Sequence, residues 1–248
     1  MTAGYTLAPT RLMRPNRLDT AHVFERVFGI YRRQAGVLLP AAVILYLIPA
    51  ALGITREFAV QAIALAASII AAVGYQGLVV QAVRDIQDDV RDLSLGGLFR
   101  SISQVLAPLL WTAILVGVGV FLGLLLFIIP GLLLLTWWAV AAPVVVCEVR
   151  SAPQALGRSR ELVRGNGWQV FGVLVVSFLL VLIADLLFAA LASAVSGSDI
   201  AFAIGNLIAG TLTAPVFALA SAVVYLELLQ LKGERLPPAD MATFTDEP

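Results

Sequence analysis

Residues 124–149 read LLLFIIPGLLLLTWWAVAAPVVVCEV, and this stretch decides how the chain is threaded. It overlaps a run without acidic or basic side chains that extends from Ile102 to Cys147. As a single helix, that run would be about twice as long as the hydrocarbon core of a bilayer is thick. Proline cannot continue the hydrogen-bond ladder of a helix, and glycine readily adopts turn conformations. Pro130 and Gly131 are therefore predicted to turn the chain between two membrane spans.

The composition of the whole chain favours a membrane protein. Of its 248 residues, 60% are hydrophobic and 13% are charged, and the mean hydropathy is +0.95. Soluble domains carry about 25% charged residues, so a bilayer is needed to cover this much apolar surface. We predict an all-α polytopic fold with six transmembrane helices and, because a long polar segment precedes the first, no cleaved signal peptide. The predicted spans are Gly36–Ile54, Ala59–Val83, Val105–Ile129, Leu132–Val149, Val170–Val195 and Ile200–Leu231.

The basic residues predict the orientation of these spans. Six spans place residues 1–35, 84–104, 150–169 and 232–248 on one side, and these hold 15 of the 16 Lys and Arg residues. The other side holds only Arg56. Because Lys and Arg accumulate on the cytoplasmic side, we expect both termini to lie in the cytoplasm. Residues 1–17 and 232–248 are predicted to be a flexible and a disordered tail, and residues 18–231 the membrane domain.

Three segments on the cytoplasmic side have the pattern of amphipathic helices. Residues 18–34 (LDTAHVFERVFGIYRRQ) and 93–106 (LSLGGLFRSISQVL) repeat apolar side chains at helical spacing. Residues 151–168 open with Ser151 and Gln154 at the spacing of a capping box and end in Gly165-Asn166-Gly167, a helix stop signal. Each segment precedes two spans, which predicts a threefold repeat over 18–83, 94–149 and 151–231. Chance likeness among interfacial helices is the alternative.

The cytoplasmic interface holds the first group of candidate site residues. Arginines at headgroup depth attract anionic lipid, although they can also serve topology alone. Glu148 and Glu227 end two spans at equivalent positions, where a carboxylate is unfavourable without a partner. For Glu148 we expect an arginine of the following segment or the start of its helix, and a solvated charge is the alternative. The predicted interface site comprises Glu148, Arg150, Arg158, Arg160, Arg164, Asn166, Trp168 and Glu227.

The second group of candidates lies inside the spans. Asp185 is an acidic residue well inside the fifth predicted span, with Ser177 earlier in the same span and Asn206 in the sixth. An aspartate at mid-depth costs about 3 kcal/mol on insertion scales and marks a functional position by default. A structural hydrogen bond between helices and a proton- or ion-linked role are both open for Asp185.

Residues 128–174 resemble a known family. The pattern is Ile129-Pro130-Gly131, the pair Trp137-Trp138, Pro143 with Glu148, Ala155-Leu156 with Ser159, and Leu162, Gly165-Asn166 and Trp168. It resembles the membrane domain associated with some bacterial glycerophosphoryl diester phosphodiesterases and related uncharacterised integral membrane proteins. Thr136 stands where the family pattern has a basic residue. Such enzymes use a soluble barrel with histidines, whereas this chain has only His22, so the resemblance implies the membrane module without the catalytic domain.

These observations favour a non-enzymatic integral membrane module. Its basic cytoplasmic collar would contact anionic lipids of the bilayer, a partner membrane protein or a second copy of the chain. The alternative is a small transporter or exporter component with an intramembrane polar site at Asp185. A membrane enzyme that acts on lipid is a third reading, for which only Glu148 with Arg160 would be placed at the interface. The resemblance implies that the protein lies in the bacterial cytoplasmic (inner) membrane. We find no P-loop, dinucleotide fingerprint, zinc spacing or nucleophile elbow, and we expect no catalytic residue, cofactor, metal or nucleic-acid partner. Small-residue spacings at Gly119 and Gly123, and at Gly205 and Ala209, allow close helix packing within the bundle.

Overall fold

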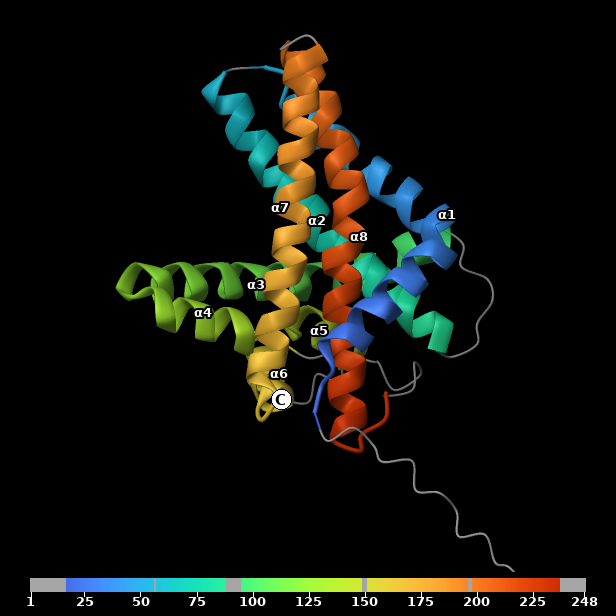
Figure 1. Cartoon of the computed structure of the whole chain (residues 1–248), viewed down its shortest axis with the longest axis vertical. Coiled ribbons are helices and arrows are strands. Elements are labelled where there is room, and N and C mark those ends of the chain that lie inside the picture. Colours follow the sequence, from blue (N-terminus) through green and yellow to red (C-terminus); the bar gives the residue numbers. More distant parts are fainter. Residues whose placement is uncertain (1–16, 56, 88–94, 149–150, 196–197, 237–248) are drawn as a thin grey trace, which may run out of the picture.

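The computed structural model is all-helical in the residues that it describes, which are 17–55, 57–87, 95–148, 151–195 and 198–236. For residues 85–104 and 199 within these ranges, only the backbone is described. The helices are α1 Thr20–Leu52, α2 Phe58–Gln87, α3 Leu95–Leu126, α4 Ile128–Trp137, α5 Ala141–Glu148, α6 Ala152–Val163, α7 Gly167–Val195 and α8 Asp199–Leu231. Figure 1 shows their arrangement.

Six helical segments of the described chain are long and apolar enough to cross a membrane, so the chain is a multi-pass membrane protein. They are Thr20–Leu52, Phe58–Arg84, Val105–Leu126, Ile128–Glu148, Gly167–Val195 and Ile200–Leu231. This agrees with the six predicted spans. Helix α1 begins well before its predicted span and α2 ends after it, because charged and polar side chains continue a helix once it has formed, whereas α3 ends at Leu126, before the predicted Ile129.

Helix α8 is the centre of the packing. It lies along α1 on one side and α7 on the other, and it also packs on α2 and α5. Nearly all of its residues between Ala218 and Leu229 are buried. Helix α1 begins at the N-cap Asp19, whose Oδ1 accepts a hydrogen bond of 2.9 Å from the Ala21 N–H. The Tyr75 hydroxyl of α2 donates to the carbonyl of Leu38 in α1, which joins the first two helices in the core.

The chain does turn between two helices near Pro130, but the turn lies at Phe127. This residue has an extended backbone (φ −160°, ψ 150°) between α3 and α4. Pro130 is the third residue of α4, where a missing N–H costs no internal hydrogen bond of the helix. Helices α3 and α4 lie side by side and run across the direction of α7 and α8 in Figure 1. An apolar arm therefore extends from the bundle.

The fourth span is interrupted, which the sequence pattern did not predict. Residues 138–140 form a turn between α4 and α5. The hydroxyl of Ser159 donates to the Trp137 carbonyl at 2.7 Å, and that of Ser221 donates to the Ala139 carbonyl at 3.3 Å. Non-helical backbone at such a place is tolerated because side chains of neighbouring helices satisfy the freed carbonyls.

The prediction of three separate amphipathic helices is wrong for two of them. Residues 20–34 are the first turns of the continuous helix α1, and residues 95–104 are the first turns of α3. The apolar stripe of each amphipathic segment leads directly into the following span, so the segment and the span form one continuous helix. Among the apolar side chains of residues 18–34, Val23 and Val27 are buried, whereas Phe28 is exposed.

Of the three predicted segments, the one at 151–168 does contain a separate amphipathic helix, α6. Its predicted capping box is confirmed, because the Ser151 N–H donates to Oε1 of Gln154. The predicted stop is also confirmed: Gly165 follows the helix with a φ of +97°, a conformation that a residue with a Cβ adopts at a cost. The threefold repeat stays a prediction.

Candidate functional site

The charged side chains gather at one end of the bundle. There α1 begins after Leu18, α6 (Ala152–Val163) lies across the bundle, and α8 ends at Leu231. We call this region the α6 end. Its ion pairs connect α1, α5 and α6 to the last turns of α8 and the residues that follow.

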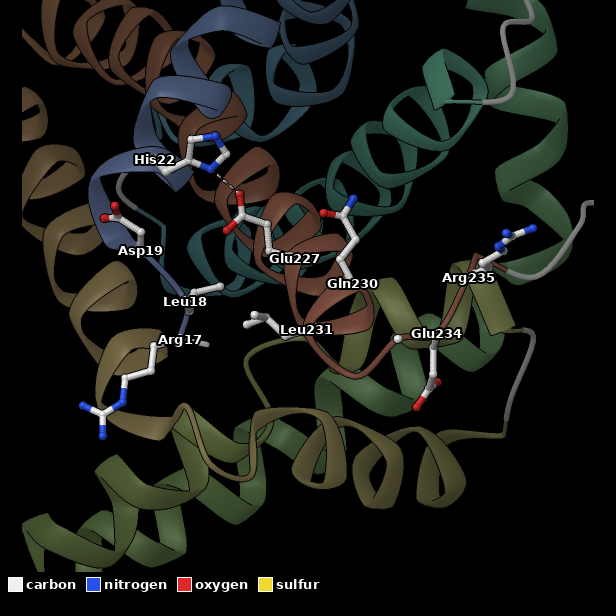
Figure 2. Close-up of a pocket in the computed structure, with 10 residues that line it drawn as sticks. Arg17, Leu18, Asp19, His22, Glu227, Gln230, Leu231, Glu234 and Arg235 are labelled. Atoms are coloured by element: carbon white, nitrogen blue, oxygen red, sulfur yellow. Dashed lines mark hydrogen bonds and ion pairs between the residues drawn. The ribbon is translucent and has the colours of Figure 1, made fainter. Parts of the chain in front are cut away.

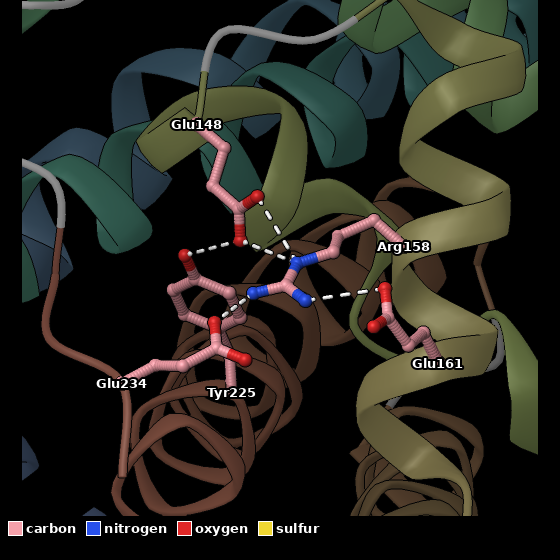
Figure 3. Close-up of polar contacts among 5 residues, drawn as sticks. All are labelled: Glu148, Arg158, Glu161, Tyr225 and Glu234. Atoms are coloured by element: carbon pink, nitrogen blue, oxygen red, sulfur yellow. Dashed lines mark hydrogen bonds and ion pairs between the residues drawn. The ribbon is translucent and has the colours of Figure 1, made fainter. Parts of the chain in front are cut away.

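A nearly buried arginine of α6 is the hub of this region (Figure 3). The Nε of Arg158 donates to both carboxylate oxygens of Glu148, at 3.3 and 3.2 Å. The same guanidinium donates to Glu161 at 3.2 Å and to Glu234 beyond α8. The Tyr225 hydroxyl of α8 donates to Glu148 at 3.1 Å. One cation thus joins α5 and α6 to the residues that follow α8, which lie 76 positions further along the chain.

The network leaves little of its central pair in contact with solvent. The side chain of Glu148 is 6% exposed and that of Arg158 is 12% exposed. Burial lowers the pKa of the Arg158 guanidinium, but the hydrogen bond to Glu234 and the charge of Glu148 outweigh this effect and raise it above its ordinary value. Arg158 is therefore a permanent cation, and its charge stabilises the carboxylates at any pH at which they are ionised.

Glu227 forms a second group of contacts, between α8 and α1 (Figure 2). Its Oε1 accepts from Nη1 of Arg26 at 3.4 Å and lies 3.0 Å from Nδ1 of His22. The carboxylate side chain is 10% exposed. Both glutamates that the sequence analysis placed at the ends of spans thus have basic partners. The partner of Glu148 is an arginine of the following helix, as predicted, and that arginine is Arg158.

An open cavity of about 750 Å³ lies beside Glu227. Residues before and at the start of α1 line one side, and the end of α8 and the residues after it line the other. Arg17 and Arg235 are exposed and lie on opposite sides of the cavity in Figure 2. Within the described part of the chain, neither arginine forms an ion pair. The cavity is lined by Arg17, Asp19, His22, Glu227, Gln230 and Arg235, together with Leu18, Leu231, Gly233 and Glu234.

Arg160 has a different role from Arg158, although the two are only two residues apart. Its guanidinium carbon lies 4.3 Å from the centroid of the Trp137 ring, which is a cation–π contact. The adjacent Ser159 is fully buried and donates to the Trp137 carbonyl. Helix α6 therefore holds the interrupted span through both the side chain and the backbone of Trp137.

Replacing Ser159 with alanine is expected to lower the free energy of unfolding by about 1 kcal/mol, because the Trp137 carbonyl then loses its partner. Thermal unfolding of the purified protein in detergent measures the change. Ser68→Ala is the matched control, since the Ser68 hydroxyl bonds only to the Ala64 carbonyl of its own helix. Equal stability of the two variants would contradict this role of Ser159.

The remaining predicted interface residues lie around the α6 end. The amide oxygen of Asn166 accepts from the Leu18 N–H at 3.3 Å and so connects the start of α7 to α1. Trp168 is 84% exposed, with its ring edge-on to Phe171. Arg164 is exposed, and it forms no ion pair with another described residue. Arg150 lies outside the described residues.

The three predicted intramembrane residues do not come together. Ser177 is buried against α8. Asn206 lines a separate cavity of about 500 Å³ among α1, α2 and α8, where Tyr46, Gln61 and Ser68 supply the other polar side chains. Asp185 is on the outer surface of α7. Ser177 and Asn206 thus line two different cavities, and Asp185 lies on the outer surface, so the structure does not group the three residues.

Sequence reasoning missed several members of the charged clusters. Arg26, Glu161, Tyr225 and Glu234 make contacts at the α6 end that were not predicted. His22 was noticed only as the single histidine of the chain. A signal that could have found Arg26, Tyr225 and Glu234 is that each lies close to the cytoplasmic-side end of an apolar helix, near Glu148 or Glu227 in depth. Glu161 lies on α6 three residues after Arg158, a spacing that favours an ion pair within one helix.

The fold and this site define a class: a multi-pass helical membrane protein whose spans are tied together at one end by buried ion pairs. No protein-family model, curated protein or solved structure matches the chain.

Proposed function

We propose that the protein is a non-enzymatic module of the bacterial cytoplasmic membrane and that it binds anionic phospholipid headgroups at its α6 end. In this proposal both termini and the α6 end face the cytoplasm, where Lys and Arg residues accumulate. The resemblance to phosphodiesterase membrane domains is consistent with a membrane module but carries no activity to this chain.

The observation that carries the proposal is that the basic residues at the α6 end fall into two groups, one paired with carboxylates and one exposed without an ion pair among the described residues. Arg26 and Arg158 are neutralised by carboxylates inside the bundle. Arg17, Arg164, Lys232 and Arg235, in contrast, are exposed at the α6 end, and none of them forms an ion pair within the described part of the chain. Cations in this position attract anionic headgroups.

Two further features fit a headgroup site. The cavity between Arg17 and Arg235 has the volume of a small-molecule site. Trp168, also at this end, is almost fully exposed, as expected for a tryptophan that lies among lipid headgroups. The phosphate would lie beside the arginines, while the acyl chains would follow the apolar surface of the spans.

The proposal predicts that the double variant Arg17→Gln/Arg235→Gln loses anionic lipid. Each basic residue near an anionic surface contributes about 1 kcal/mol, so binding of phosphatidylglycerol is expected to weaken roughly tenfold to thirtyfold. Native mass spectrometry of the full chain, titrated with phosphatidylglycerol and in parallel with phosphatidylcholine, measures the change.

The matched control is Arg32→Gln/Arg33→Gln, which removes the same charge from exposed positions of α1 that do not line the cavity. This variant is expected to retain most of the binding. Equal loss in both variants would indicate a general effect of charge. Equal binding of the two lipids by the unmodified protein would contradict the proposal outright.

A further inference from the structure

The outer surface of α7 carries a polar group that the fold does not use. The face of α7 that packs on α8 includes the buried residues Val173, Ser177 and Ala192. Asp185 lies off this face and is exposed. It is about 27 Å along the helix from Gly167, within the part of α7 that the hydrocarbon core surrounds.

The surroundings of Asp185 on the protein surface are apolar. Phe178 and Leu182 precede it at helical spacing and are exposed, and Leu186 beside it is 61% exposed. Its carboxyl group has no hydrogen-bond partner in the part of the chain that the structure describes. Lipid tails offer none either, and acidic residues in spans almost always face a protein partner or water. Contact with lipid alone therefore leaves the carboxyl group of Asp185 without the partner that it needs in the membrane.

We propose that a second copy of the chain covers this face and that the two α7 helices pack against each other through Asp185. Two copies in one membrane have the same orientation, so residues at the same depth meet across a twofold axis. Asp185 then meets Asp185 of the second copy, and the two carboxyl groups can share a proton in a hydrogen bond. The surface is thus complementary to itself.

The side chains next to Asp185 allow this approach. Ala189 and Ser193 follow it one and two turns later on the same side of α7, and the Ser193 hydroxyl already bonds to the Ala190 carbonyl of its own helix. Small residues spaced four apart let the backbones of two spanning helices come close. Helix α8 is the main partner of α7 within the chain, which leaves this side open to a second copy.

Disulfide cross-linking in native membranes tests the contact. Ala189→Cys is expected to form a covalent dimer under mild oxidation. Leu187→Cys is the matched control, because Leu187 is 59% exposed at nearly the same depth but points about 160° away from Ala189 around the helix. The native Cys147 is buried and needs no replacement. Failure of Ala189→Cys to cross-link above the control, or its cross-linking only to a different protein, would overturn the proposal.

Substitution of the carboxyl group tests its role independently. Asp185→Leu is expected to weaken dimerisation roughly tenfold, whereas Asp185→Asn, which keeps the hydrogen-bonding capacity, changes it less than threefold. Photobleaching of single labelled molecules in vesicles, counted at several protein-to-lipid ratios, measures the dimer fraction. A wild-type dimer fraction for Asp185→Leu would exclude Asp185 from the contact. Because the lipid site lies at the α6 end, retention of phosphatidylglycerol reports on the proposed function separately.

Discussion

Replacing Arg158 with methionine is expected to lower the free energy of unfolding by about 3–5 kcal/mol. Methionine keeps the apolar stem of arginine but lacks the guanidinium group, so Glu148 loses the charge of Arg158 while it stays almost fully buried. Leaving one member of a buried ion pair without its partner is among the most destabilising changes known for single residues. Glu161 and Glu234 would lose the same partner. Denaturation of the purified protein in detergent, followed by tryptophan fluorescence, measures the loss.

Two comparisons make this prediction specific. Arg164→Met removes an exposed arginine that directly follows the same helix, and it is expected to change stability by less than about 0.5 kcal/mol. Adding Glu148→Gln to Arg158→Met should recover part of the loss, because a neutral amide is less costly to bury than a carboxylate that has lost the charge of Arg158. If Arg158→Met and Arg164→Met are equally stable, the network does not hold the bundle together.

The second large effect is expected for Gly131→Ala in the arm formed by α3 and α4. A Cβ at Gly131 would lie 2.7 Å from the backbone nitrogen of Leu124, and one at Gly123 would lie 2.9 Å from the Cα of Gly131. The two helices are thus in backbone contact and cannot admit a methyl group without moving apart. We expect a loss of about 2–3 kcal/mol in the free energy of unfolding, at the upper end of typical overpacking effects.

Gly117→Ala is the matched control, since a Cβ at this position of α3 meets nothing within 4 Å. Alanine is the better helix former, so this variant is expected to be neutral or more stable by about 0.5–1 kcal/mol. The two variants carry the same chemical change and should differ in sign. Similar stabilities would show that α3 and α4 are not packed as closely as the structure indicates.

The candidate site was predictable in part. A glutamate at the end of an apolar helix needs a basic partner, and this local argument placed both Glu148 and Glu227 in ion pairs. Which arginine pairs with Glu148 was not predictable, because Arg158 and Arg160 differ by about 200° around α6 and the packing of that helix decides which one points inward. Arg160 instead lies over the Trp137 ring.

For the intramembrane candidates, too, the sequence did not predict the direction in which each side chain points. Their depth follows from counting along each span, and on this basis Asp185, Asn206 and Ser177 were grouped. Their direction around the helix axis depends on which face each helix turns toward its neighbours. The structure directs Ser177 toward α8, Asn206 toward the cavity beside α1 and α2, and Asp185 away from the bundle.

The sequence by itself determined the number of candidate spans, the turn near Pro130 and the gathering of basic residues in four segments. These follow from the length of apolar runs, from proline and glycine, and from charge, which are local properties of the chain. Tertiary structure alone decided the hub at Arg158, the break after Trp137 and the exposure of Asp185. Each of these depends on the rotation and tilt of one helix against another, and such quantities are set by the shapes of side chains that are distant in the sequence.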